Sequence, residues 1–255
     1  MEVKSIMSRR VVSVQRKTTV KEVVAKMAAK NISCVVVVNK KLPIGIFTKH
    51  DLLALLDAGT DLSKTAIEAA MHTPVMPIEE TDDLFTAARQ MGMLDVRRFV
   101  IVDQTNMLTG IVTETDIVNT YALRTFPHNV GLASMADMQG LTATPKTPLK
   151  KIARMMLESR KTCVTILKNR KPVGVVNERL FIKAAAKGNA PLKGAAEKLM
   201  NKKFVTGKSE ESVREAVITM IRQGQREIVL VDENGHYVGA VTQRNLVRYI
   251  EKSQS

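Results

Sequence analysis

Apolar and polar positions along the chain follow a pattern that occurs four times. In the first copy, Val20, Val23, Val24 and Met27 recur at the spacing of one helix face. The apolar run at 34–39 is typical of a strand buried on both faces. The elements predicted in this copy are a strand at 11–14, a helix at 18–30, strands at 34–39 and 44–48 joined by a turn at 40–43, and a helix that starts near Thr48.

Three series of residues recur at intervals of 64 or 65 positions. The glycine that follows the hairpin turn is found at Gly45, Gly110, Gly174 and Gly239. One methionine series is Met27, Met91, Met156 and Met220, and another is Met7, Met71, Met135 and Met200. Independent series that agree on one period indicate an internal repeat.

Each copy predicts a β-α-β-β-α unit, so the expected fold class is α/β (α+β), with four tandem units. A small sheet covered by helices on one side leaves an apolar face exposed, and we therefore expect the units to pair. The expected boundaries are a first pair at 1–123 with units at about 1–60 and 65–123, a linker at 124–133, and a second pair at 134–255 with units at about 134–190 and 194–255.

Composition adds limits to this picture. The chain has 255 residues, of which 45% are hydrophobic and 25% charged, as is typical of a soluble globular protein. No apolar run approaches the roughly 20 residues that a membrane-spanning helix needs. Cys34 and Cys163 do not form a disulfide framework, and we expect a cytoplasmic protein.

The net charge of +14 is unevenly distributed along the sequence. Residues 1–128 hold 16 basic and 14 acidic residues, a net +2, whereas residues 129–255 hold 23 and 11, a net +12. Such a field favours anionic partners, including phosphorylated ligands and nucleic acid. Solvated surface lysines that serve solubility are the alternative.

The third strand of each copy runs directly into a helix, and this junction carries the candidate chemistry. Its four versions are Gly45-Ile-Phe-Thr-Lys-His-Asp51, Gly110-Ile-Val-Thr-Glu-Thr-Asp116, Gly174-Val-Val-Asn-Glu-Arg-Leu180 and Gly239-Ala-Val-Thr-Gln-Arg-Asn245. A Thr at a helix start lies beside free N–H groups that favour phosphate. The Asp one turn later can accept hydrogen bonds from ribose hydroxyls. Thr-x-x-Asp is also an ordinary capping box.

Four such units with a recurring Gly-h-h-Thr-x-x-Asp junction, where h is apolar, resemble cystathionine-β-synthase (CBS) domains arranged as two Bateman modules. The resemblance covers nearly the whole chain. It implies a non-catalytic module in which the Asp holds a ribose, the Thr contacts phosphate and the paired unit supplies the base pocket. The implied ligands are AMP, ADP, ATP or S-adenosylmethionine.

Carried over residue by residue, the resemblance implies unequal pockets. Thr113 and Asp116 would face Thr18, Ile32 and Ser33, the fullest set and the expected best site. Thr48 and Asp51, with His50, would face Val96, Arg97 and Asp82, where Asp82 replaces an expected Thr. Thr242, Arg244 and Asn245 would face Thr147, Lys161 and Thr162. Leu180 cannot hold a ribose hydroxyl, so its pocket is expected to be empty or altered.

The other residues of the sequence indicate no catalytic or metal-binding site. The four histidines show no metal-ligand spacing, the two cysteines fit packing positions, and no catalytic constellation is found. We therefore expect no enzyme, no metal and no membrane partner, but a regulatory protein that binds an adenine nucleotide and signals to another protein. The alternative is a nucleic-acid-associated protein that uses the basic second half. The sequence leaves open whether the modules join within one chain or as a homodimer.

Overall fold

The computed structural model describes residues 1–122, 126, 129–188 and 191–253. The first unit contains β1 (Ser13–Gln15), α1 (Val20–Ala29), β2 (Cys34–Asn39), β3 (Leu42–Thr48) and α2 (Lys49–Asp57). The second contains β4 (Pro77–Glu79), α3 (Leu84–Met93), β5 (Arg98–Val102), β6 (Leu108–Thr113) and α4 (Glu114–Ala122). The third contains β7 (Thr142–Ala143), α5 (Leu149–Ser159), β8 (Cys163–Lys168), β9 (Lys171–Asn177) and α6 (Glu178–Ala186). The fourth contains β10 (Val205–Lys208), α7 (Val213–Arg222), β11 (Glu227–Val231), β12 (Tyr237–Thr242) and α8 (Gln243–Ser253). Four 3-10 helices precede the units: η1 (Val3–Ser5), η2 (Ile67–Ala69), η3 (Leu132–Met135) and η4 (Ala196–Lys198).

The mixed α/β fold and the β-α-β-β-α unit are as predicted. In each unit the first strand pairs in parallel with the second, and the second pairs antiparallel with the third. Thr19 caps the start of α1. Its side chain accepts a hydrogen bond from the Glu22 backbone, and the Glu22 side chain accepts from the Thr19 backbone, which makes a complete capping box.

The strand β2 is buried on both faces, as its apolar run predicts. Val35 and Val37 point to the helices of their own unit, whereas Val36 and Val38 join Val100 of the second unit in a separate apolar cluster. An equivalent cluster between the third and fourth units joins Cys163, Val175 and Val229. Sheet contacts therefore join the first unit to the second, and the third to the fourth.

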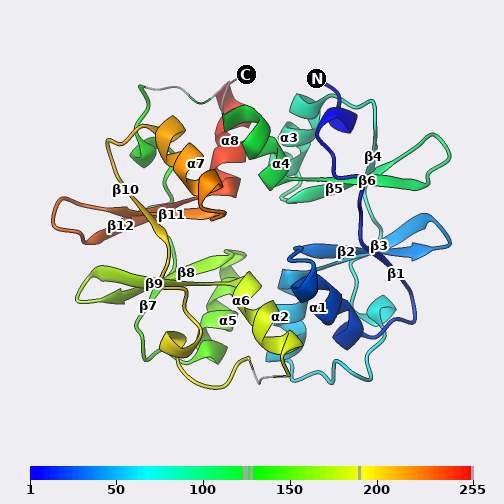
Figure 1. The fold of residues 1–255 in the computed structure, drawn as a ribbon, viewed down its shortest axis with the longest axis horizontal. Coiled ribbons are helices and arrows are strands. Elements are labelled where there is room, and N and C mark those ends of the chain that lie inside the picture. Colours follow the sequence, from blue (N-terminus) through cyan, green and yellow to red (C-terminus); the bar gives the residue numbers. More distant parts are fainter. Residues whose placement is uncertain (123–125, 127–128, 189–190, 254–255) are drawn as a thin grey trace.

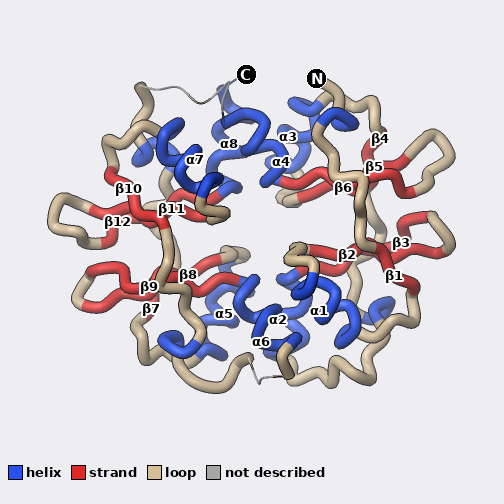
Figure 2. The backbone as a smooth tube through the Cα atoms, viewed as in Figure 1, coloured by secondary structure: helices blue, strands red, loops and turns tan. Residues whose placement is uncertain are grey.

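Helix contacts close these pairs into a ring within one chain (Figures 1 and 2). The helices α1 and α2 pack on α5 and α6, and α3 and α4 pack on α7 and α8. Leu53 of the first unit is buried in the core of the third, and Ile182 of the third is buried in the core of the first. The sequence left open whether the two modules join within one chain or through a homodimer. In the structure they join within one chain.

Two of the repeating series belong to the same contact. The sulfur of Met71 lies over Gly45, that of Met7 over Gly110, and that of Met200 over Gly174, and a Cβ on any of these glycines would overlap the methionine side chain. Met7 thereby ties the chain start to the second unit. The fourth copy differs, because Gly239 is approached by the Asp137 carbonyl and by Met138 and not by Met135. In three of the four copies the glycine therefore leaves room for the methionine of the recurring series.

The structure also bears on the predicted linker, the unit boundaries, the cysteines and the expected absence of membrane-spanning helices. Residues 124, 125, 127 and 128 of the predicted linker lie outside the described residues, whereas Phe126 and Leu132 are buried in the core shared by the second and fourth units. The exact unit boundaries stay predictions. Both cysteines are free and buried. None of the helices in the described part of the chain is long and apolar enough to cross a membrane.

Candidate functional site

The second helix of every unit begins near the centre of the ring. The first backbone N–H of each helix donates to the residue just before or at the start of the central strand of its own unit: Lys49 to Ser33, Glu114 to Arg97, Glu178 to Thr162 and Gln243 to Arg226. Helix N-termini carry unpaired N–H groups and a positive dipole end. Residues at all four helix starts line the two cavities described below, so the fold gathers four such termini in one place.

A cavity of about 500 Å³ lies between the first and second units beside Asp51, and we call it the Asp51 cavity. Its volume is within the range of ligand pockets. Part of its wall is apolar, formed by Ile46, Pro74, Val75, Met76, Val96, Phe99 and Val100. Basic side chains line another part, namely Lys49, His50, Arg97, Arg98, Arg160 and Arg244.

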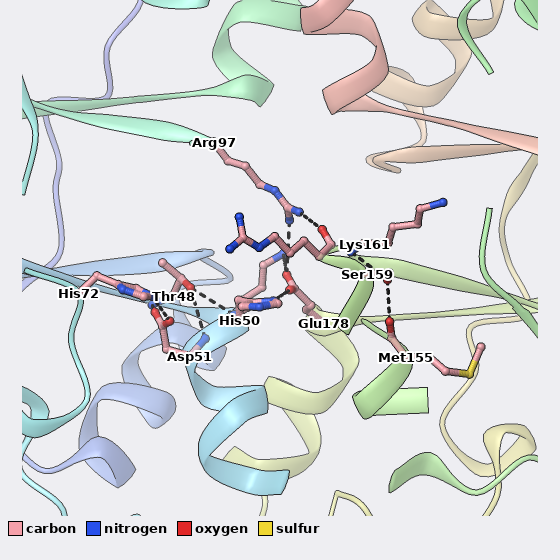
Figure 3. Close-up of polar contacts among 11 residues, drawn as sticks. Thr48, His50, Asp51, His72, Arg97, Met155, Ser159, Lys161 and Glu178 are labelled. Carbon is pink, nitrogen blue, oxygen red and sulfur yellow. Dashed lines mark hydrogen bonds and ion pairs between the residues drawn. The ribbon is translucent and has the colours of Figure 1, made fainter. Parts of the chain in front are cut away.

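Thr48 and Asp51 lie in this cavity as a capping box. The Thr48 backbone N–H donates to Asp51 Oδ2 at 2.7 Å, and the Thr48 hydroxyl accepts from the His50 and Asp51 backbones. The other oxygen, Asp51 Oδ1, lies 2.7 Å from His72 Nε2 (Figure 3). Capping therefore occupies one carboxylate oxygen and leaves the other directed at a histidine whose side chain is 71% exposed.

Glu178 brings a carboxylate of the third unit into the site of the first. Its side chain is buried, with His50 Nδ1 at 3.1 Å, Lys49 Nζ at 3.9 Å and Arg97 at 4.0 Å (Figure 3). Burial alone would raise the pKa of Glu178, but the hydrogen bond with His50 and the charges of Lys49 and Arg97 outweigh it and hold the pKa below its usual value. Burial lowers the pKa of Lys49 to about 8, against the opposing effect of Glu178.

A second cavity, of about 350 Å³, lies between the third and fourth units and extends across the ring centre to Ser33 of the first unit and Thr113 of the second. We call it the Asn245 cavity. Asn245 Oδ1 accepts from the Thr242 backbone at 2.9 Å and from the Thr242 hydroxyl at 2.6 Å. Lys161 lines the same cavity but is paired with Asp137 at 2.6 Å. An incoming phosphate would have to compete with that carboxylate for Lys161.

The two cavities meet at the centre of the ring. Residues that line both are Lys49, Asp95, Arg97, Arg98, Arg160 and Arg244. Arg244 is ion-paired with Asp95, and Arg97 donates to the Arg160 carbonyl at 2.8 Å. The buried Arg98 Nε has no hydrogen-bond partner among the described residues. Basic groups thus exceed acidic ones in this shared wall, which suits an anion.

Two further carboxyls lie beside this basic wall, the partly buried Glu114 and the buried Glu227. Burial raises the pKa of Glu114 to about 7, although Arg97, Arg98 and Arg226 each act to lower it. Burial also raises the pKa of Glu227, which accepts a 2.8 Å hydrogen bond from Asn177. A protonated carboxyl leaves the surrounding arginines without a counter-charge.

The structure does not bring all of the predicted site residues into these cavities. Those that line one or both are His50, Thr48, Asp51, Val96, Arg97, Ser33, Thr113, Thr162, Lys161, Thr242, Arg244 and Asn245. Thr18, Ile32, Asp116 and Thr147 line neither cavity. Thr147 accepts from the Thr144 backbone in a turn, and the doubtful Asp82 accepts similarly from Glu79.

In the junction of the third unit, Asn177 occupies the position of the threonine and Leu180 that of the aspartate. Leu180 has no oxygen with which to complete a capping box, and Asn177 makes no side-chain cap. Asn177 bonds instead to Glu227 of the fourth unit. The expectation that this pocket does not hold a ribose, and the expectation that the Asp116 cleft is the best site, stay predictions.

Several residues of the cavities were missed by the sequence analysis. Among them are Lys49, His72, Arg160 and Glu178. Lys49 and Glu178 occupy the same repeat position, the first of the second helix, and a comparison of that position among the copies was the available signal. His72 and Arg160 reach the Asp51 cavity only through tertiary contacts. The described residues contain no group of His, Cys, Asp and Glu that could hold a metal ion.

Comparisons with known proteins assign the four units to one family of domains. A family model described as the CBS domain matches residues 3–58, 66–122, 138–187 and 196–252. Protein MJ1225 of Methanocaldococcus jannaschii is 20% identical over 95% of this chain and 96% of its own length. Protein MK0525 of Methanopyrus kandleri is 30% identical over 47% of this chain, a match that spans 62% of the relative.

Solved structures show the same fold over the whole chain. The crystal structure of MJ1225, a candidate archaeal homologue of g-AMPK, has a TM-score of 0.88 at 19% identity and covers 98% of this chain and 99% of its own. A conserved protein from Pyrococcus horikoshii has a TM-score of 0.67 at 20% identity, with 98% and 100% covered.

Proposed function

Because this chain belongs to the CBS-domain family, we propose that it is a regulatory protein that binds an adenine nucleotide or a related adenosyl compound and signals its presence to another protein. The proposal includes no catalytic step. The observation that carries it is the division of the Asp51 cavity into an apolar wall, a carboxylate at a helix start and a cluster of basic side chains. These three parts match a base, a ribose and phosphate.

The ligand would occupy the Asp51 cavity in a defined direction. The base packs against Val75, Met76 and Val96, where its apolar faces replace water. The ribose hydroxyls donate to Asp51 Oδ1 and displace His72 from it. The phosphates then extend toward the ring centre and the basic side chains, including Arg98, whose Nε would gain a partner.

Ligand binding would change contacts between units, which is what a partner protein can detect. Arg97 and Glu178 belong to different modules and both line the Asp51 cavity. A phosphate that attracts Arg97 competes with Glu178 and with the Arg160 carbonyl for the same guanidinium. A ligand shifts the equilibrium between two relative orientations of the units only if its contacts in the two orientations differ in free energy.

Calorimetric titration with AMP, ADP, ATP, S-adenosylmethionine and GMP tests the proposal. We expect at least one adenosyl ligand to bind and GMP to bind more weakly or not at all. Asp51→Ala should weaken that binding about ten- to a hundred-fold, because it removes a charge-assisted contact of roughly 1.5–3 kcal/mol. Asp61→Ala, a change of the same kind in an exposed turn outside both cavities, serves as the control. Failure of every adenosyl ligand to bind would refute the proposal.

A further inference from the structure

Charge is divided between the two ends of the ring much more sharply than between the halves of the sequence. The first and third units, residues 8–70 and 137–200, hold 25 basic and 9 acidic residues, a net +16. The second and fourth units, counted over 1–7, 71–122, 129–136 and 201–253, hold 13 and 16, a net −3. The N-terminal segment is counted with the second unit because Val3 and Met7 are buried in its core.

The two helices α1 and α6 pack side by side at the positive end (Figure 1). Ile182 of α6 is buried among the core residues of α1, and Arg179 donates to Asn31 at 2.6 Å. Five exposed lysines lie on or directly after these helices and form what we call the lysine face: Lys21, Lys26, Lys30, Lys183 and Lys187. None of the five has an ion-pair partner within 4.0 Å among the described residues. The exposed Glu22 of α1 is the one acid on this face, and it interacts electrostatically with Lys26 at a longer distance.

More exposed cations of the third unit extend the positive surface beyond this face. They are Lys146, Lys150, Lys151, Arg154, Lys193 and Lys198. At the other end of the ring, α3 carries Gln90 where α1 has Lys26, and Leu94 follows α3 where Lys30 follows α1. Helix α8 keeps cations, Arg248 and Lys252, at the positions of Lys183 and Lys187. The pseudo-symmetric positions therefore differ in charge between α1 and α3, and this difference distinguishes one end of the molecule from the other.

The residue types on the lysine face favour one class of anionic partner over the others. Its exposed uncharged positions on α1 and α6 are small, such as Ala25, Ala29 and Ala186. The exposed large hydrophobic residues of the described chain all lie elsewhere. A membrane-surface helix needs large apolar anchors, a protein interface needs apolar or aromatic hot spots, and single-stranded nucleic acid needs aromatic platforms. A duplex needs only cations for its phosphates.

We propose that the lysine face binds the phosphate backbone of duplex nucleic acid without reading its sequence. Helix α1, with 10 residues, is about 15 Å long. Over that length a duplex presents about nine phosphate charges at one per about 1.7 Å of axis. The lysine face contains none of the residues that line the two cavities, so this function is separate from nucleotide binding.

Fluorescence anisotropy of a labelled 30-base-pair DNA duplex of arbitrary sequence, titrated with the full chain, tests the proposal. Five phosphate contacts predict that affinity falls several hundred-fold between 50 and 200 mM salt, following a slope of about −0.9 per contact. Replacing all five lysines by Gln should weaken binding at least ten-fold at 50 mM salt and flatten the salt slope by about four to five. Replacing them by Arg should preserve binding.

The matched control replaces five exposed cations at the other end, Arg89, Lys202, Lys208, Arg222 and Lys252, by Gln. It should leave affinity within about two-fold, because it makes the same change in net charge away from the lysine face. Equal losses in the two variants, or no duplex binding by the unmodified chain at 50 mM salt, would overturn the proposal. Tighter binding to vesicles of phosphatidylcholine and phosphatidylglycerol than to the duplex would also overturn it and indicate a membrane surface.

Discussion

Glu114 is a carboxyl that the fold holds in an unfavourable environment at the ring centre. Its pKa of about 7 compares with 4.5 for an ordinary glutamate, because burial disfavours the charged form more than the nearby arginines favour it. Since the folded state binds this proton more tightly than the unfolded state, folding stability from this group is lost as pH rises from about 4.5 to about 7.

Glu114→Gln should therefore stabilise the protein at pH 7.5 and leave it nearly unchanged at pH 5. We expect a difference of about 1–3 kcal/mol at the higher pH, since each pKa unit corresponds to about 1.4 kcal/mol and partial exposure reduces the effect. Denaturant unfolding at both pH values measures it, with the exposed Glu158→Gln as the control. An equal effect of Glu114→Gln at the two pH values would contradict this account.

At the scale of elements, the start of the second helix combines capping with a candidate ligand contact in the first, second and fourth units. Asp116 Oδ2 accepts from the Thr113 backbone at 2.8 Å and from its hydroxyl at 2.7 Å. Capping boxes of this kind contribute about 1 kcal/mol to stability. The same aspartate thus has a structural role whether or not its cleft binds a ligand.

Asp116→Ala should lower the free energy of unfolding by about 1 kcal/mol, and it should also weaken one nucleotide site about ten- to a hundred-fold. Chemical denaturation measures the first effect and calorimetry the second. Asp116→Asn, which keeps an oxygen that can accept from Thr113 but removes the charge, separates the two roles, because it should preserve the cap and still weaken the ribose contact. Calorimetry that shows unchanged affinity in Asp116→Ala would assign this aspartate to capping alone.

At the scale of the whole molecule, the two modules depend on each other for their cores. Leu53 and Ile182 are each buried in the core of a unit that belongs to the other module. Separated modules would expose these side chains together with the helix faces around them. Large exposed apolar patches on a soluble protein promote association.

The separately expressed halves 1–123 and 124–255, divided so that Phe126 and Leu132 stay with the second half, should therefore combine into a 1:1 complex when mixed. Size-exclusion chromatography with light scattering gives the mass of the product. Leu53→Asp should abolish the complex, because it places a charge in the core of the third unit. Leu42→Asp, on an exposed hairpin, should not affect it. Halves that remain separate monomers would contradict the mutual dependence.

Much of the unit followed from the sequence because it is coded locally. The helix face of Val20 to Met27, the doubly buried strand at Val35 to Val38 and the cap at Thr48 each depend on residues within one or two turns. The paired Gly and Met series could be counted along the chain, although their shared contact could not. Repetition made each weak local signal strong, since four copies had to agree.

Tertiary structure alone decided how the copies meet. The contacts of His50 with Glu178 and of Thr115 with Gln243 join residues 128 positions apart, and no local pattern records them. The approach of His72 to Asp51 likewise depends on the path of a loop between two units. The sequence by itself determined four repeated units and four junctions whose side chains already differ, with Leu180 and Asn245 in place of Asp51 and Asp116. The ring decided which side chains of other units face each junction and gathered positive charge at one end, because charge and burial depend on which units become neighbours in space.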